Sequence, residues 1–136
     1  MKKRYLAAFV VTVLALGIPA GGHHATQAEF DQNNIVVIEG VMTKVLWVNP
    51  HVNWIMDVKD AKTGETTTWT IVGAGPGAFR AAGLSARGFF KVGERYKASI
   101  CLARNGSPRG HIMTFETPDG KVLKIWSGNY DDPLGK

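Results

Sequence analysis

The stretch TTTWTIVGAGPGAFRAA, residues 66–82, decides the fold. Its first part, 66–72, is rich in threonine and other residues that favour extended backbone, which predicts a β-strand. Glycines then end the strand. Residues 76–82 predict a short helix, with Pro76 in its first turn and Phe79 as its anchor in the core. The chain therefore passes from a strand into a helix at this point.

Two strands are predicted before this stretch. The first runs from Ile35 to Val48 and is broken by Gly40, which suggests a bulge or a sharp bend. Asn49-Pro50 then interrupts the chain, because proline cannot donate to a central ladder. In the second strand, apolar and polar residues alternate, which predicts one buried face with the members Val52, Trp54, Met56 and Val58.

Two or three strands are predicted after the helix, at residues 96–102, 111–116 and 122–126. Three strands, a short helix and then two or three strands is the order of a small OB-like β-barrel. The predicted fold class is therefore mainly β, an OB-like barrel of five or six strands with one short helix between the third and fourth strands. An open β-sandwich is the competing architecture.

The first 22 residues have the pattern of a secretory signal peptide. Basic residues at 2–4 precede an apolar run of 14 residues, 5–18, and small residues follow. A helix that spans a bilayer needs roughly 20 residues, so we expect cleavage, export to the bacterial periplasm and no stable membrane span afterwards, with a retained anchor as the alternative. The expected organisation is a signal peptide at 1–22, an extended leader at 23–33, the barrel at 34–127 and a loose tail at 128–136.

The charge balance gives little support to nucleic-acid binding. Without Lys2, Lys3 and Arg4, 13 basic residues remain against 11 acidic ones, a net charge of +2, whereas nucleic-acid-binding domains usually have a strongly basic face. Cys101 is the only cysteine, so no internal disulfide can form. We expect Cys101 to be a small buried or half-buried residue, with a dimer disulfide or a soft-metal ligand as alternatives.

No catalytic motif is present, and no enzyme is predicted. The glycine-rich residues 73–77 lack the Lys-Ser/Thr pair that a phosphate loop requires, and Pro76 removes one backbone donor. No Gly-x-Ser-x-Gly sequence occurs either. The glycines are therefore predicted to form a tight turn.

The histidine pair at His23 and His24 is the strongest chemical signal, and its value depends on signal cleavage. Cleavage after Ala20 would leave Gly-Gly-His at the N-terminus, whose four nitrogens form a square plane suited to Cu(II) or Ni(II). Cleavage after Gly22 would pair the terminal amine with the imidazole of His23. Cleavage after Ala28 would remove both histidines, and a solvated leader without a ligand is the other alternative.

The two remaining histidines lie on or beside predicted strands. His51 follows the Asn-Pro turn on the polar face of the second strand. By alternation, His111 shares a face with Met113 and Phe115, and an imidazole with a thioether two residues farther on suits copper. For each histidine, the alternative is a ring hydrogen-bonded to the backbone.

Motifs along nearly the whole chain resemble an uncharacterised bacterial family of small exported proteins, a domain of unknown function. The resemblance rests on a histidine pair after the signal, an Asn-Pro-His turn, a Trp before the mid-chain loop, and turn glycines: His23-His24, Phe30-Asp31, Gly40-Val41, Trp47-Val48-Asn49-Pro50-His51, Trp69, Gly93, Asn105-Gly106 and Asp119-Gly120. Ala25 is a departure, since members often have Ser there. The resemblance implies location and fold more than activity, and it favours cleavage after Ala20 or Gly22.

The sequence predicts a periplasmic binding or accessory protein that binds Cu(II) or another divalent metal ion. The predicted ligands are His23, His24 and His51, followed by His111 and Met113. Neutral imidazoles would capture the ion, so affinity would fall as the pH drops below their pKa values. The alternative is a metal-free module that binds a small molecule or a periplasmic protein through exposed aromatic residues, with Trp47 and Asn49 as the ligand-binding residues.

Overall fold

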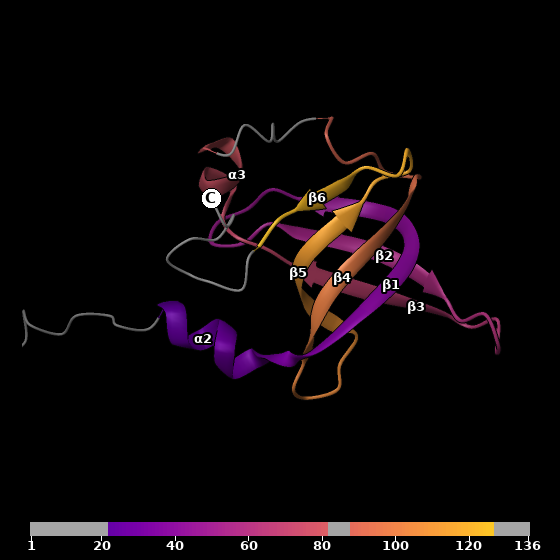
Figure 1. The fold of residues 1–136 in the computed structure, drawn as a ribbon, viewed down its shortest axis with the longest axis horizontal. Coiled ribbons are helices and arrows are strands. Elements are labelled where there is room, and N and C mark those ends of the chain that lie inside the picture. The colour runs from indigo at the N-terminus through magenta and orange to yellow at the C-terminus, as the bar shows by residue number, and fades with distance from the viewer. Residues whose placement is uncertain (1–21, 82–87, 127–136) are drawn as a thin grey trace, which may run out of the picture.

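The computed structural model describes residues 22–81 and 88–126, and it describes side chains from Thr26 onward. In chain order the elements are α2 (Gly22–Glu29), β1 (Phe30–Leu46), β2 (Asn53–Lys59), β3 (Thr66–Val72), α3 (Pro76–Ala81), β4 (Arg95–Ala103), β5 (Arg109–Glu116) and β6 (Val122–Lys124) (Figure 1). Strands make up most of the described chain, so the predicted mainly β class is confirmed.

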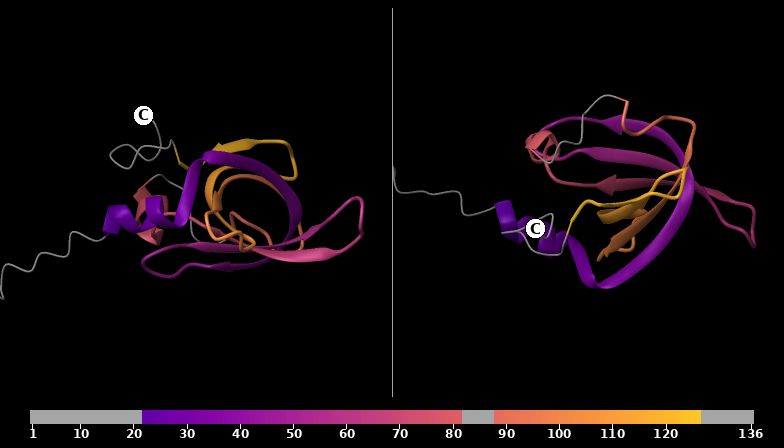
Figure 2. Two further views of the ribbon diagram at one scale, coloured as in Figure 1. Left: turned by 90° about the horizontal axis from the view of Figure 1, so that it is seen from below. Right: turned by 45° about the horizontal axis from the view of Figure 1, so that its top comes forward.

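Five strands form a closed ring (Figure 2). The antiparallel neighbours are β1 and β2, β2 and β3, β1 and β4, and β4 and β5, and a parallel pairing of β3 with β5 closes the ring. α3 connects β3 to β4, and β6 pairs with β5 as a sixth strand. This is the order of an OB-like barrel, so the predicted barrel is confirmed and the open sandwich was wrong.

β1 is long enough to pair with two neighbours in turn. Its first part pairs with β4 and its last part with β2, and the exchange occurs beside Gly40 at Val41. A Cβ at Gly40 would collide with the carbonyl oxygen of Asp57, so glycine lets β2 approach closely. In the pairing with β2, the register shift lies between Met42 and Lys44 instead. Gly40 therefore permits the close approach of β2 to β1, and the irregularity in their pairing comes a few residues later.

Aromatic rings fill the interior of the barrel. The alternation predicted for β2 is confirmed, and Trp54 on its buried face has no exposed surface. The ring of Trp54 lies with centroid distances of 5.1–5.5 Å from those of Phe79, Phe90 and Phe115. Since Phe79 belongs to α3 and is 3% exposed, this helix covers the interior through the predicted anchor.

A second group of buried residues packs on the outer face of β3, β4 and β5, and we call it the outer cluster. Its members are Phe30, Val72, Cys101, Ala103 and Trp126, with Met113 partly buried against them. Ile71 and Ile100 belong to the interior core although each is next in sequence to a member, because successive side chains of a strand point to opposite faces. Cys101 is buried, as predicted.

A register shift in β5 corrects one prediction. The pairing with β4 leaves Met113 as an extra residue, which is a β-bulge. Ile112 and Phe115 therefore both belong to the interior core. The prediction that His111, Met113 and Phe115 share one face was wrong for Phe115, since alternation does not continue through a bulge.

The residues before the barrel differ from the expected extended leader at 23–33. Residues 22–29 form α2, and β1 begins at Phe30 instead of near Ile35. Phe30 is 2% exposed within the outer cluster, so burial of its ring extends the strand. The predicted signal peptide, apart from Gly22, and the predicted tail lie outside the described residues. In the described segments, no helix has the length and apolar character needed to cross a bilayer.

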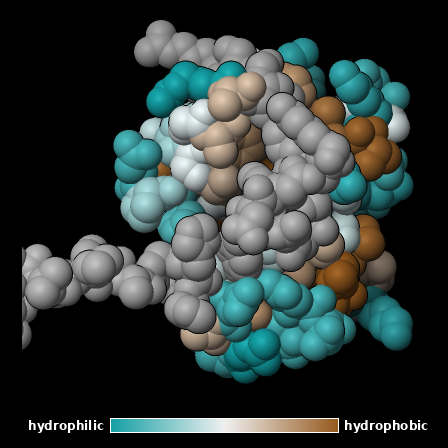
Figure 3. Space-filling view, turned by 60° about the vertical axis from the view of Figure 1, so that its left-hand side comes forward, coloured by the Kyte–Doolittle hydropathy of each residue, from teal (hydrophilic) through white to brown (hydrophobic). Residues whose placement is uncertain are grey.

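On the side of α2, the visible described residues are mostly hydrophilic, with hydrophobic residues in separate areas (Figure 3). Large apolar side chains that are exposed come from several segments: Ile35, Val37, Val48, Val92 and Val122. Scattered residues of this kind are normal on protein surfaces. Polar atoms that are buried carry more information about function.

Candidate functional site

His51 is held in one orientation by the backbone. Its Nδ1 atom lies 2.9 Å from the carbonyl oxygen of Gly73. A carbonyl oxygen only accepts, so Nδ1 carries the proton and donates it, and Nε2 of the neutral ring keeps its lone pair. Histidines that bind metal ions commonly have their other ring nitrogen fixed by a backbone carbonyl in this way. The half-buried ring is therefore oriented to bind a ligand through Nε2.

Glycines allow the β1–β2 connection and the β3–α3 connection to pack together around this contact. The amide of Gly73 donates to the carbonyl oxygen of Val52 at 2.9 Å. A Cβ at Gly75 would lie 2.9 Å from the carbonyl oxygen of Pro50, and a Cβ at Gly73 would lie 2.6 Å from the ring of Trp54. The glycines at 73 and 75 therefore allow close packing against the Asn-Pro-His turn. The sequence predicted a tight turn at 73–77 but did not indicate this packing.

His111 is buried in contact with the outer cluster, at 6% exposure. Its ring centroid lies 4.6 Å from that of Trp126 and 5.7 Å from that of Phe30. Its neighbours on the adjoining strands are Cys101 on β4 and Val72 on β3. Its Nδ1 atom has no hydrogen-bond partner of normal geometry among the described residues. An unpaired buried nitrogen costs about 1–3 kcal/mol, so packing alone does not account for a histidine here.

The environment keeps the ring of His111 neutral. Burial lowers its pKa from 6.5 to about 4. The charge that His51 can carry contributes to this shift, whereas the backbone of Ile112 opposes it. At pH 7 the ring is thus in the form that binds metal ions.

The two histidines lie near each other. His51 contacts Gly73, which follows Val72, and Val72 is the neighbour of His111 in the β3–β5 pairing. The influence of His51 on the pKa of His111 agrees with this placement. Among the described side chains, no group of three or more His, Cys, Asp and Glu residues is arranged to hold a metal ion. A metal ion bound here would therefore need donors beyond this set.

The predicted pair His23 and His24 lies in α2, and the side chains of both fall outside the described ones. The C-terminal end of α2 is anchored by the β4–β5 connection. The amide of Arg104 donates to the carbonyl oxygen of Glu29 at 2.9 Å, and Nε of Arg109 lies 2.6 Å from the carboxylate of Glu29. Figure 1 shows α2 on the side of the barrel where α3 also lies. No sequence motif marks the two anchoring arginines.

Two sulfur atoms accompany His111. Cys101 is 1% exposed, burial raises the pKa of its thiol, and the nearby carboxylate of Asp31 raises it further. Met113 is half-buried against the outer cluster. The sequence indicated Met113 as a companion of His111, but the position of Cys101 opposite His111 depends on the pairing of β4 with β5.

The predicted ligand-binding residues Trp47 and Asn49 differ in burial. The ring of Trp47 packs edge-on against Phe79, with centroids 5.7 Å apart, and it is half-buried against the interior core. Asn49 is exposed. The expectation of an exposed Trp47 is therefore met only for part of the ring.

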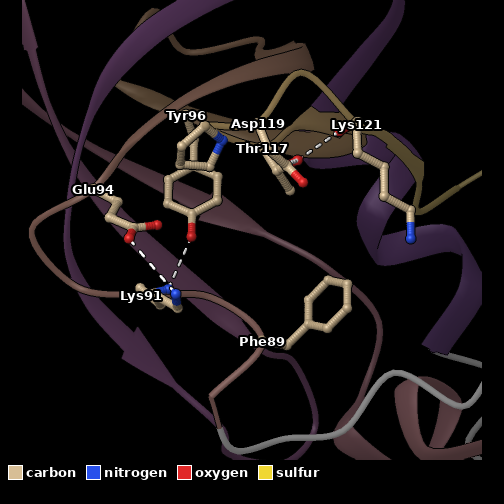
Figure 4. A pocket seen from close by; sticks show the side chains of 8 residues that line it. Phe89, Lys91, Glu94, Tyr96, Thr117, Asp119 and Lys121 are labelled. Carbon is tan, nitrogen blue, oxygen red and sulfur yellow. Dashed lines mark hydrogen bonds and ion pairs between the residues drawn. The ribbon is translucent and has the colours of Figure 1, made fainter.

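A pocket of about 410 Å³ lies beside the start of β4 and the β5–β6 turn (Figure 4). Two aromatic rings and several charged side chains line it: Phe89, Tyr96, Lys91, Glu94, Asp119 and Lys121, with Thr117 and Pro118. The amide of Lys91 donates to the hydroxyl of Tyr96 at 2.9 Å, and its Nζ lies 3.8 Å from Glu94. Opposite charges in the wall thus neutralise one another in part.

Comparison with known proteins gives a family match. The sequence model of a family described as "Family of unknown function (DUF6152)" matches residues 10–112. No curated protein and no solved structure matches the chain. The resemblance to an uncharacterised domain of unknown function is therefore confirmed. The match covers His51, Cys101 and His111 and ends just before Met113.

Proposed function

The chain belongs to the family of unknown function DUF6152, and from its own side chains we propose that it is an exported protein that binds a copper ion or another divalent metal ion through histidines. The oriented ring of His51 carries this proposal, because its Nδ1–H is engaged by Gly73 and its Nε2 lone pair is available. Imidazole nitrogen suits copper, zinc and nickel ions.

The proposed ligand set extends from His51 in two directions. His111 is near and neutral, with Met113 beside it on β5. His23 and His24 would add donors from the N-terminal segment, and the C-terminal end of α2 is anchored to the barrel at Glu29. The mechanism is capture of the ion by neutral imidazoles, without a chemical reaction.

The periplasmic location is proposed from the N-terminal sequence. Three basic residues, a short apolar run and small residues precede the histidine pair. Cleavage after Ala20 or Gly22 would leave the pair at or beside the new N-terminus. Export would also place the protein where metal ions enter the cell envelope, so a carrier or accessory role fits the small single domain.

The test is a Cu(II) titration of the exported, purified protein against a competing chelator, read by native mass spectrometry. We expect one Cu(II) per chain and a mature mass that starts at Gly21 or His23. His51→Asn should lower the affinity at least about tenfold, or about 1.4 kcal/mol. The asparagine amide can still donate to Gly73, while the Nε2 ligand is lost.

Urea unfolding of His51→Asn is the control, since the retained hydrogen bond should leave the free energy of unfolding within about 0.5 kcal/mol of wild type. An unchanged Cu(II) affinity in a folded His51→Asn variant would refute the role of this residue. Failure of the wild-type protein to retain Cu(II) would refute the proposed function in divalent metal binding. A mature start at Glu29 would remove the N-terminal pair from the site.

A metal-free binding module is the second candidate, and the pocket in Figure 4 favours it. In this case a small molecule or a periplasmic protein partner would contact exposed aromatic and polar residues, and metal would be irrelevant. If the ligand binds in this pocket, Phe89→Ala would abolish its binding. If it binds at the other predicted position, Trp47→Ala would abolish its binding. A non-metal mass retained by the purified protein would support this candidate.

A further inference from the structure

The outer cluster brings soft donor atoms to one side of the sheet. Cys101 on β4 and His111 on β5 are direct partners in the strand pairing. Side chains at such positions have Cβ atoms about 4.5–5.5 Å apart. Met113, the bulged residue of β5, is half-buried against the same cluster. A thiol, an imidazole and a thioether therefore surround one small region.

The unpaired nitrogen of His111 separates this arrangement from an ordinary buried cysteine. The residue is only 6% exposed, and its Nδ1 atom has no hydrogen-bond partner of normal geometry among the described residues. Buried polar atoms are normally satisfied, so an exception in a native fold indicates an additional role. An ion bound by this ring and the neighbouring sulfur atoms would satisfy it.

We infer that Cys101, His111 and Met113 form a site for monovalent copper, Cu(I), an inference that deepens the proposed function in metal binding and rests on it. Thiolate and thioether sulfur are soft ligands that select Cu(I), whereas carboxylate and water oxygen suit harder ions. His51 and the N-terminal histidines offer nitrogen alone, which suits Cu(II). Cu(I) is thus assigned to a set that adds the sulfur of Cys101 to His111 and Met113, whereas His51 and the N-terminal histidines are the main donors for Cu(II).

The surroundings of the three donors also favour a monovalent ion. Phe30 and Trp126 lie against His111 with exposures of 2% and 6%, so they exclude water from the site. A hydrated divalent ion would lose much of its solvation there.

Binding involves a proton exchange and no redox step. Sγ of Cys101 releases its proton to solvent as the bond from Sγ to copper forms, because the thiolate is the ligand. Nδ1 of His111 and Sδ of Met113 donate lone pairs and lose no proton. Copper enters as Cu(I) and stays Cu(I), so the site needs no reductant once the ion is supplied in that state.

The experiment is an anaerobic titration of the full mature protein with Cu(I) in competition with a chromophoric Cu(I) chelator. The variants are Cys101→Ala, Met113→Leu and His51→Asn, each titrated in parallel with Cu(II) under air. Met113→Leu conserves volume at a half-buried position, so this variant retains the fold. Near-ultraviolet circular dichroism of the tryptophans verifies folding in each case.

We expect one Cu(I) per chain, bound with the ultraviolet absorption of a copper–thiolate bond. Met113→Leu should weaken Cu(I) binding at least about tenfold, and Cys101→Ala should do so more strongly and abolish the absorption. His51→Asn should lower the Cu(I) affinity less than either sulfur variant does. Unaltered Cu(I) affinity in both sulfur variants would overturn the inference. The proposed function would still be decided by the Cu(II) affinity of His51→Asn. Failure of wild type to bind either ion would overturn both.

Discussion

The two faces of β4 and β5 differ in chemistry although both are buried. Toward the barrel interior these strands present Ile100, Ile112 and Phe115, which are apolar. Toward the outer cluster they present Cys101 and His111, which carry sulfur and nitrogen. Neither face needs polar atoms for packing. The interior therefore accounts for the fold, whereas the unpaired Nδ1 atom of His111 beside the outer cluster costs stability and requires a functional explanation.

The largest effect is expected from truncation in the interior. Trp54→Ala should lower the free energy of unfolding by about 3–5 kcal/mol, because Trp54 contacts three aromatic rings and has no exposed surface. Urea unfolding monitored by far-ultraviolet circular dichroism measures the loss. Trp126→Ala, at the margin of the outer cluster, is the comparison and should cost clearly less. Equal losses would mean that the outer cluster is as structural as the interior.

The second effect is a loss of stability in acid that originates in the outer cluster. His111 has a pKa of about 4 in the folded protein against 6.5 for the ordinary ring. Between these values the unfolded chain binds a proton at this residue and the folded chain does not. The free energy of unfolding therefore falls as the pH decreases through this window, by about 3 kcal/mol at pH 4.

This acid effect is measured by urea unfolding across the window, with a chelator present to keep the protein free of metal. His111→Phe is the matched variant, because it keeps a flat ring and removes the titrating group. Groups near His111 that also titrate or carry charge include His51 and Cys101, and Asp31 acts on Cys101; all three remain in the variant. A pH dependence identical to that of wild type in His111→Phe would show that they, and not His111, cause the loss.

Much of the barrel could be predicted from sequence, and the physical reason is local. Alternation in β2 requires only that one face be buried, and the strand–glycine–helix order at 66–82 limits how β3 can connect to β4. The bulge at Met113 could not be predicted, because its neighbours all suit a strand and the register depends on β4. The same pairing brings Cys101 opposite His111. The sequence therefore indicated the nitrogen of His111 and the sulfur of Met113 on β5, but not the sulfur of Cys101 on β4.

The smallest effect tests how the packing of the connections positions His51. Gly75→Ala would bring a Cβ to 2.9 Å from the carbonyl oxygen of Pro50, so the Asn-Pro-His turn must shift. We expect a loss of about 1–3 kcal/mol in the free energy of unfolding and a weaker Cu(II) affinity, measured by urea unfolding and by the chelator competition. Gly77→Ala, where a Cβ meets nothing within 4 Å, should leave both unchanged or slightly stabilise α3. If Gly75→Ala loses stability but keeps its Cu(II) affinity, this close contact supports the barrel and does not position the metal ligand.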